Sequence, residues 1–291
     1  MKYSSRIFLY APFVALLILA ALAMIHWWID ASAWSGRLDR ANGHDIMPGV
    51  KLSFAEKKIA GFPFRLDTVL KNVRVDVSEA TGPISWTSEN FAMHVLTYGR
   101  TQAILESAGR QILSWYDANG TEHRFVFLPG TFRASALFQH GQLARFDSEI
   151  RDLDGEDFRA GDAQLHFRSN GSSIDLYFKL NNAHIPGSYA AAHGPDVESL
   201  TADASLNRGA ILAKLLRGED VPARALEEWR QNGGQLAVND LALKRNDRPA
   251  SVAGTLSLDT AHDLSGTVAG PDFSLRFEGN RIGLTSGLSR S

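Results

Sequence analysis

Apolar and polar residues alternate one by one through most of the chain after residue 49, and this period of two constrains the fold more than any other feature. In the segment VKLSF, Val50, Leu52 and Phe54 fall on one side, with Lys51 and Ser53 on the other. Successive side chains of a β-strand point to opposite faces of the sheet. The alternation therefore predicts strands with one apolar face and one solvated face.

The same alternation recurs in further segments, most of them separated by short polar turns that contain glycine. The predicted strands are 62–67, 73–77, 89–98, 123–128, 131–138, 141–153, 162–168, 173–180, 235–245, 251–260, 263–270 and 273–284. Asn119-Gly120 is a strong hairpin signal before one of them. This spacing predicts a mainly β fold, an antiparallel meander that forms a curled sheet or a sandwich. Residues 101–117 also fit a helix, so their structure stays open at this point.

One segment, 209–232, breaks the alternation with apolar residues at helical spacing. Pro222 suits the first turn of a helix, and Gly233-Gly234 suits a helix end. We expect two short helices with a break near Gly218. Such an insert could cover part of the apolar side of the sheet, because that side needs a neighbour that shields it from water.

The N-terminal run from Ile7 to Ile25 contains no charged residue. As a helix it spans roughly 28 Å, close to the hydrocarbon thickness of a bilayer. Lys2 and Arg6 precede the run, and Asp30 is the first charged residue after it. The positive-inside rule then keeps the N-terminus in the cytoplasm and exports the rest of the chain.

A cleaved signal peptide is the rival interpretation, because Ala31-Ser32-Ala33 matches a small-x-small cleavage pattern. The apolar run is longer than the usual h-region of about 7–15 residues, however. Trp27 and Trp28 also lie where an interfacial aromatic belt is expected. We therefore favour an uncleaved anchor, and both interpretations send residues 34–291 out of the cytoplasm.

These patterns divide the chain into three parts. Residues 1–29 form a cytoplasmic stub and a transmembrane helix, with 7–29 in contact with the membrane. Residues 30–48 form a short helix and a linker, and 49–291 form a β-rich exported domain that includes the helical insert at about 209–232. The expected topology is a single membrane pass, with the N-terminus in the cytoplasm and the bulk of the chain exported.

The composition and the motifs give no sign of chemistry. A net charge of −2 gives no basic field for nucleic acid, and the absence of cysteine excludes disulfides and thiolate catalysis. The sequence has no HExxH, GxSxG, GxxxxGK[ST] or GxGxxG motif. The acidic stretch from Asp152 to Asp157 reads as a solvated turn rather than a calcium site. We expect no enzyme, and no catalytic residue, metal ligand or cofactor.

The apolar side of the strands is then the remaining candidate site. It is either a closed core or an open groove for an acyl chain or an apolar partner. The residues that we expect in this core or groove are Phe54, Phe62, Phe64, Leu66, Phe125, Phe127 and Phe178. Phe62 and Phe64 are expected in the sheet interior, with Arg65 and Asp67 as neighbours on the solvated side.

Several segments carry a resemblance to a known family. An N-terminal anchor followed by RLDRANGHDIMPGVKLSF and AGFPFRLD, and later LEEWRQNGGQLAVNDLALKR and GTLSLD, resembles an alphaproteobacterial family of membrane-anchored envelope proteins, the domain of unknown function numbered 2125. The C-terminal GLTSGLSRS is short and polar compared with the family pattern. The resemblance implies an inner-membrane anchor and a β-rich periplasmic domain. The architecture is also similar to that of AsmA-like envelope proteins, whose long sheets carry lipid.

Together these arguments predict a non-enzymatic protein that maintains the cell envelope by binding or transferring lipid through an apolar sheet groove. The alternative is a structural or scaffolding subunit that docks another envelope protein, for example through an exposed sheet edge.

Overall fold

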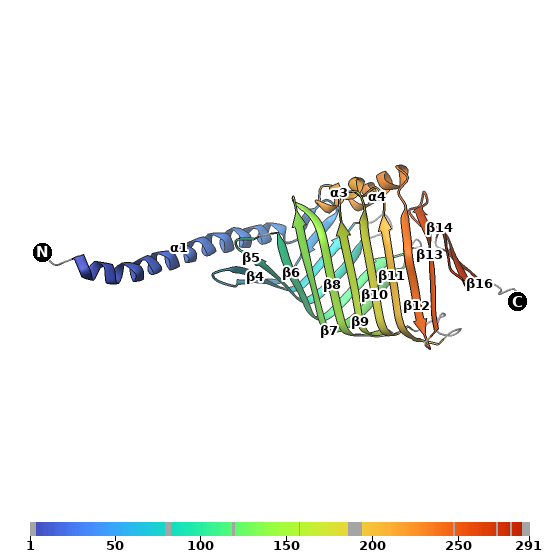
Figure 1. The fold of residues 1–291 in the computed structure, drawn as a ribbon, viewed down its shortest axis with the longest axis horizontal. Helices are drawn as coiled ribbons and strands as arrows, with labels where there is room; N and C mark the ends of the chain where they lie inside the picture. Colours follow the sequence, from blue (N-terminus) through green and yellow to red (C-terminus); the bar gives the residue numbers. More distant parts are fainter. Residues whose placement is uncertain are drawn as a thin grey trace.

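An antiparallel sheet of 16 strands dominates the fold, so the prediction of a mainly β meander with a short helical insert is confirmed (Figure 1). The computed structural model describes residues 4–78, 83–99, 101–117, 120–156, 158–185, 194–246, 248–271, 273–279 and 281–286. Most strands pair with the next strand along the chain, and β3 is the exception because it pairs with β4 beside β2.

The helices are α1 (Ser4–Ala41), α3 (Gly209–Leu216) and α4 (Pro222–Gln231). The strands are β1 (His44–Met47), β2 (Val50–Ser53), β3 (Glu56–Ala60), β4 (Arg65–Val77), β5 (Ile84–Leu96), β6 (Gln102–Tyr116), β7 (Glu122–Gln139), β8 (Gln142–Gly155), β9 (Arg159–Ser169), β10 (Ile174–His184), β11 (Asp196–Leu206), β12 (Leu236–Arg245), β13 (Arg248–Leu258), β14 (Leu264–Ala269), β15 (Phe273–Glu278) and β16 (Arg281–Ser286).

Several strands differ from the predicted boundaries. The segment 101–117, whose pattern also fits a helix, contains the strand β6. The predicted strand 273–284 is a hairpin of two strands, because Gly279 turns the chain with a φ of 61°. The alternation did not predict β1, β3 or β11. Asn119 of the predicted hairpin signal lies outside the described residues.

Helix α1 is one continuous helix of 38 residues, about 57 Å long. Its part from Pro12 to Ala41 is long and apolar enough to cross a membrane, a property that an N-terminal signal sequence shares. The helix runs through most of the predicted linker, and the sheet begins at His44 rather than after residue 48. Figure 1 shows α1 projecting from one end of the sheet.

One face of the sheet carries an apolar row that crosses twelve strands. Directly paired residues of antiparallel strands have side chains on the same face. Starting at β4, the pairs follow one another from strand to strand and every member is apolar or glycine. The row is Leu66, Val95, Ala103, Ala136, Phe146, Phe167, Leu176, Ala204, Val238, Gly254, Val268 and Leu275. We call the side of the sheet that carries this row the apolar face.

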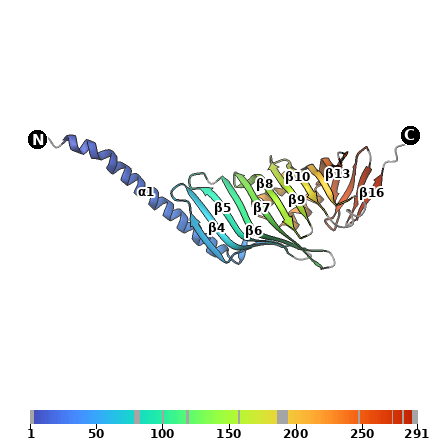
Figure 2. The ribbon, with the colours of Figure 1, turned by 90° about the horizontal axis from the view of Figure 1, so that it is seen from below.

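The sheet curls around its apolar face. Helix α3 begins against the β9–β10 turn, where the Gly209 N–H donates to the Ser172 carbonyl over 2.8 Å. After α3, Gly218 lies against Met47 of β1, since a Cβ at Gly218 would be 3.3 Å from the Met47 Cβ. The nine residue steps from Gly209 to Gly218 cover about 14 Å at the rise of a helix, whereas β1 and β10 would lie about 38 Å apart in a flat sheet. The first strands therefore bend back towards the middle ones, as Figures 1 and 2 show.

Buried apolar residues form four separate clusters in the described part of the chain. One joins the end of α1 to β4 around Leu38, Leu70 and Val73. A second lies between the helical insert and the sheet around Trp229, and the remaining two lie along the middle strands and at β13–β14. The apolar face is thus packed in patches along its length.

Candidate functional site

The middle of the apolar face is partly open. Leu165 of β9 pairs with Ser148 on one side and with Phe178 on the other, so its side chain shares the apolar face with theirs. Its side chain is nevertheless 41% exposed. Leucine at the centre of a closed sandwich would be buried, because burial of its side chain is worth about 1.5–3 kcal/mol. This exposure distinguishes an open apolar surface from a filled core.

The helical insert covers the apolar face at one end of strands β9 to β13. Trp229 of α4 is buried with Ile174 and Leu212. Its indole N–H donates to the Asn207 carbonyl over 2.7 Å, which satisfies the one polar atom of the ring. The predicted break is also present, since Gly218 has a φ of 70° between α3 and α4. The insert therefore covers part of the apolar face, as the sequence suggested.

The last turns of α1 cover the apolar face at β4 and β5. Leu38 is buried against Leu70 and Val73. The Trp34 indole N–H donates to the Thr68 hydroxyl over 2.8 Å. These contacts fix the direction in which α1 leaves the sheet.

A cavity of about 250 Å³ lies between α1 and the start of the apolar row. The helix contributes Trp34 and Arg37, and the sheet contributes Leu66, Val95 and Ala103, the first three residues of the row. Arg37 is the basic residue of this lining. The cavity thus joins the base of α1 to one end of a continuous apolar path.

The opposite face of the sheet is polar, and its charged groups pair with one another. His94 lies 2.7 Å from Asp67, and His166 lies 2.7 Å from Asp147. Burial raises the pKa of Asp147, but hydrogen bonds from His166 and Arg145 outweigh it and lower that pKa below its ordinary value. Within the described residues, no group of three or more His, Asp or Glu side chains could hold a metal ion.

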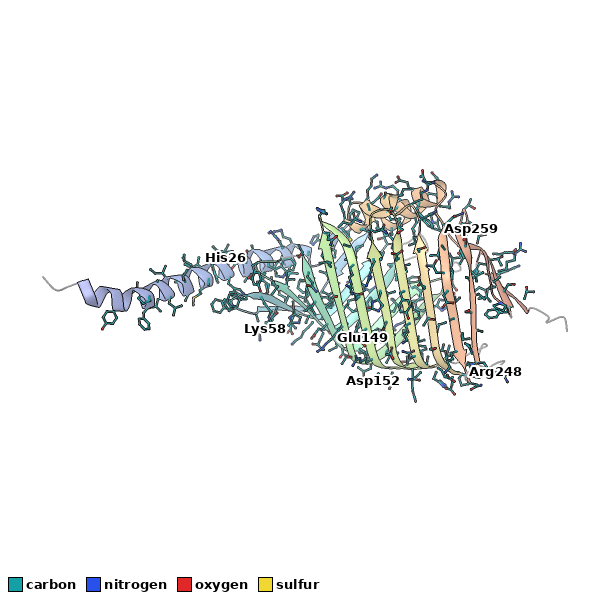
Figure 3. The ribbon with its side chains drawn as sticks, viewed as in Figure 1. His26, Lys58, Glu149, Asp152, Arg248 and Asp259 are labelled. Carbon is teal, nitrogen blue, oxygen red and sulfur yellow. The ribbon has the colours of Figure 1, made fainter. Side chains whose placement is uncertain are left out.

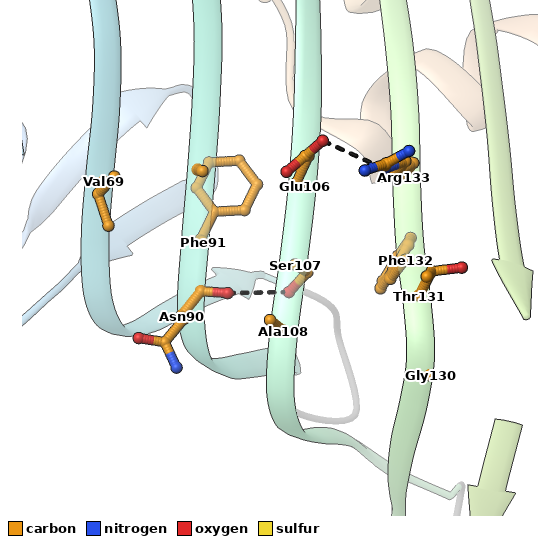
Figure 4. A pocket seen from close by; sticks show the side chains of 11 residues that line it. Val69, Asn90, Phe91, Glu106, Ser107, Ala108, Gly130, Thr131, Phe132 and Arg133 are labelled. Carbon is orange, nitrogen blue, oxygen red and sulfur yellow. Dashed lines mark hydrogen bonds and ion pairs between the residues drawn. The ribbon is translucent and has the colours of Figure 1, made fainter. Parts of the chain in front are cut away.

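Two shallow cavities lie along the sheet, and neither presents a reactive centre. The one in Figure 4, about 210 Å³, has Glu106 and Arg133 paired across β6 and β7 over 3.2 Å. The other, about 470 Å³, is lined by Arg133, Glu149 and His166. The Glu149 carboxylate also accepts from Arg151 over 2.9 Å. These charges neutralise each other within the sheet.

A buried polar cluster interrupts the apolar face at the bulges of β5 and β6, and sequence reasoning missed it. Gln111 is 0% exposed and donates to the Ser88 hydroxyl over 3.1 Å. The Ser88 and Ser107 hydroxyls lie 2.6 Å apart, and the Ser107 hydroxyl donates to the side-chain amide oxygen of Gln111. The members satisfy each other, so the cluster stabilises the bulge.

The predicted apolar residues separate into three groups. Phe125, Phe127 and Phe178 belong to one cluster along the middle strands, where the Phe125 and Phe127 rings stack at 5.2 Å. Phe54 packs in the cluster under α1, and Leu66 lines the cavity beside α1. These five residues therefore lie on or beside the apolar face.

The expectation that Phe62 and Phe64 lie in the sheet interior is wrong. They are 50% and 62% exposed and precede β4, which begins at Arg65. The reason is the turn at Gly61, whose φ of 98° and close approach to the Arg65 carbonyl exclude a side chain there. Arg65 and Asp67 are neighbours as predicted, 3.0 Å apart.

The chain belongs to the family DUF2125, described as uncharacterized proteins conserved in bacteria, which matches residues 27–270. This confirms the resemblance that the sequence motifs carry. No curated protein and no solved structure matches the chain.

Proposed function

We propose that this protein binds lipid acyl chains on the apolar face of its sheet, as a non-enzymatic inner-membrane protein of the bacterial envelope. The observation that carries the proposal is the unbroken apolar row from Leu66 to Leu275 together with the 41% exposure of Leu165 in its neighbouring row. Leu66, Ala103 and Val268 of the row are themselves buried, so the exposed apolar side chains beside them support the site. A soluble domain otherwise keeps exposed apolar patches small.

The dimensions support an acyl chain as the ligand. Eleven strand spacings of about 4.8 Å make the path about 53 Å long. A narrow, extended, apolar ligand matches such a path better than a compact one. The path also begins at the cavity beside α1, which would bring it close to a membrane that α1 crosses.

The same geometry supports transfer of lipid along the path. Each pair of neighbouring strands offers a similar apolar contact, so a chain that slides by one strand exchanges one set of contacts for an equivalent set. Binding that is moderate at many sites allows movement, whereas one deep site would retain the ligand.

Mass spectrometry of co-purifying lipid tests the proposal. The full-length protein is purified in detergent, washed extensively, and its retained phospholipids are counted per chain. The control is residues 1–41 fused to an unrelated soluble domain, which carries the same anchor and retains only the lipid bound to it. We expect more lipid on the full-length protein; equal amounts on both proteins would refute the proposal.

A docking role remains the second candidate, and one observation favours it. Strand β16 is the last strand of the sheet path, and Ile282 on it is 65% exposed. A strand from another envelope protein could extend the sheet at this edge. Loss of a co-purifying protein on Ile282→Lys substitution, with lipid retention unchanged, would support this role.

A further inference from the structure

Three exposed aromatic residues gather where the sheet meets α1. Phe62 and Phe64 flank Pro63 in the turn before β4, and Tyr98 follows β5. They are 50%, 62% and 76% exposed. The Thr97 N–H donates to the Phe64 carbonyl over 3.0 Å, which ties the two loops together. We call Phe62, Phe64 and Tyr98 the aromatic tip.

The aromatic tip lies against α1 at one defined height. The Phe62 ring meets the Trp27 ring edge to face at 5.8 Å. The Trp27 indole N–H also donates to the Arg65 carbonyl over 2.8 Å. Trp27 follows the last residue of the uncharged run, Ile25, by two positions, which is about 3 Å along a helix. The tip therefore lies at the level where the apolar run ends.

Aromatic side chains at this level match the membrane–water interface. Trp and Tyr concentrate there because their rings combine an apolar body with a polar atom. Basic residues flank the tip as well: Lys58 lies on the neighbouring β3, and Arg65, which is paired with Asp67, begins β4. Figure 3 shows Lys58 at the end of the sheet that approaches α1, on which His26 lies. Cations at this position favour anionic lipid headgroups.

We propose that the aromatic tip inserts into the interfacial region of the same bilayer that α1 crosses, on the exported side. This inference rests on the proposed membrane anchoring of α1, and it is separate from lipid binding on the apolar face. The continuity of the tip with Trp27 identifies the bilayer as its partner. α1 and the tip then form two contacts that set the tilt of the sheet on the membrane.

The tip has a consequence for the cavity beside α1. Trp34 and Arg37 of its lining follow Trp27 by seven and ten residues, about 10–15 Å along the helix. Insertion of the tip holds this opening just above the lipid headgroups. A lipid that leaves the leaflet would meet Arg37 and then the start of the apolar row.

Site-specific fluorescence tests the insertion in the full-length protein. The chain has no cysteine, so single substitutions Phe64→Cys and Tyr98→Cys accept one environment-sensitive probe each. Thr255→Cys, exposed on the polar face of β13, is the matched control. The proteins are reconstituted into vesicles of phosphatidylcholine and phosphatidylglycerol that contain spin-labelled lipids.

We expect probes at positions 64 and 98 to show blue-shifted emission and quenching by lipids that carry the spin label near the glycerol. The probe at position 255 should be quenched by aqueous iodide instead. Equal iodide quenching at all three positions would overturn the insertion. This outcome differs from failure of the proposed function, because the lipid count on purified protein does not depend on where the tip lies.

Discussion

The open middle of the apolar face predicts that one charge placed there blocks lipid binding without unfolding the sheet. Leu165→Glu puts a carboxylate on the apolar face, between Ser148 of β8 and Phe178 of β10. Because Leu165 is already 41% exposed, its replacement removes less buried apolar surface than replacement of a fully buried leucine would. The carboxylate keeps access to water in the free protein, and it is desolvated only when an acyl chain lies beside it.

The expected loss of binding free energy follows from the apolar contacts that the acyl chain no longer makes. A chain that crosses one strand spacing of about 4.8 Å presents about four methylene groups to that strand. At about 0.8 kcal/mol per buried methylene, the loss is about 3 kcal/mol. That free energy weakens binding about a hundredfold.

Ile104→Glu is the control variant. Ile104 is 47% exposed, close to the value for Leu165, and lies on the polar face between His94 and Ser135. Titration of each detergent-solubilised protein with a fluorescent phospholipid gives the dissociation constants. Ile104→Glu should bind as the unmodified protein does. Equal binding by both variants, with both folded by circular dichroism, would refute the proposed binding surface.

Two further predictions concern the helical insert. Trp229→Ala removes a buried ring and its hydrogen bond to the Asn207 carbonyl, so it should lower the free energy of local opening of α3 and α4 by about 3–5 kcal/mol. Amide hydrogen exchange measures this free energy. Trp229→Phe loses chiefly the hydrogen bond and should lower the same free energy by about 1 kcal/mol. Hydrogen bonds from Arg230, His262 and Gln231 hold the pKa of Glu227 well below its ordinary value of 4.5. A lowered pKa stabilises the fold above pH 4.5, and the contribution is lost as the pH falls towards the lowered value. The melting temperature should therefore fall on acidification, and Glu227→Gln should reduce that fall; an unchanged slope would contradict this role.

The alternation of side chains predicted most of the strands and their two faces. The prediction holds for Val73, Val75 and Val77 of β4 because each of them pairs with a residue of β5 whose side chain lies on the same apolar face. It left β6 open because a bulge between Ser107 and Gln111 shifts the register there. Two of the inward residues at that bulge are also polar, so neither the period nor the composition marked the strand.

The position of the aromatic tip and the curl of the sheet could not be predicted in this way. The alternation of Phe62, Phe64 and Leu66 suggested one strand, but the turn at Gly61 moves the first two residues outside the sheet. The curl depends on the contact between Gly218 and Met47, which lie far apart in sequence. A pattern of period two assigns side chains to faces, and it contains no information on which distant elements meet.

Photo-crosslinking along the apolar face tests the central claim most directly. A photoreactive phenylalanine analogue replaces Phe146, Phe167 or Phe277, which lie on the apolar face at increasing distance along the sheet from α1. Tyr177 and Arg276 are the matched positions on the polar face. Irradiation of cells grown with radiolabelled phosphate should give phospholipid adducts at the three phenylalanine positions and none at the other two. Adducts on neither face, or equally on both, would contradict a lipid path on the apolar face.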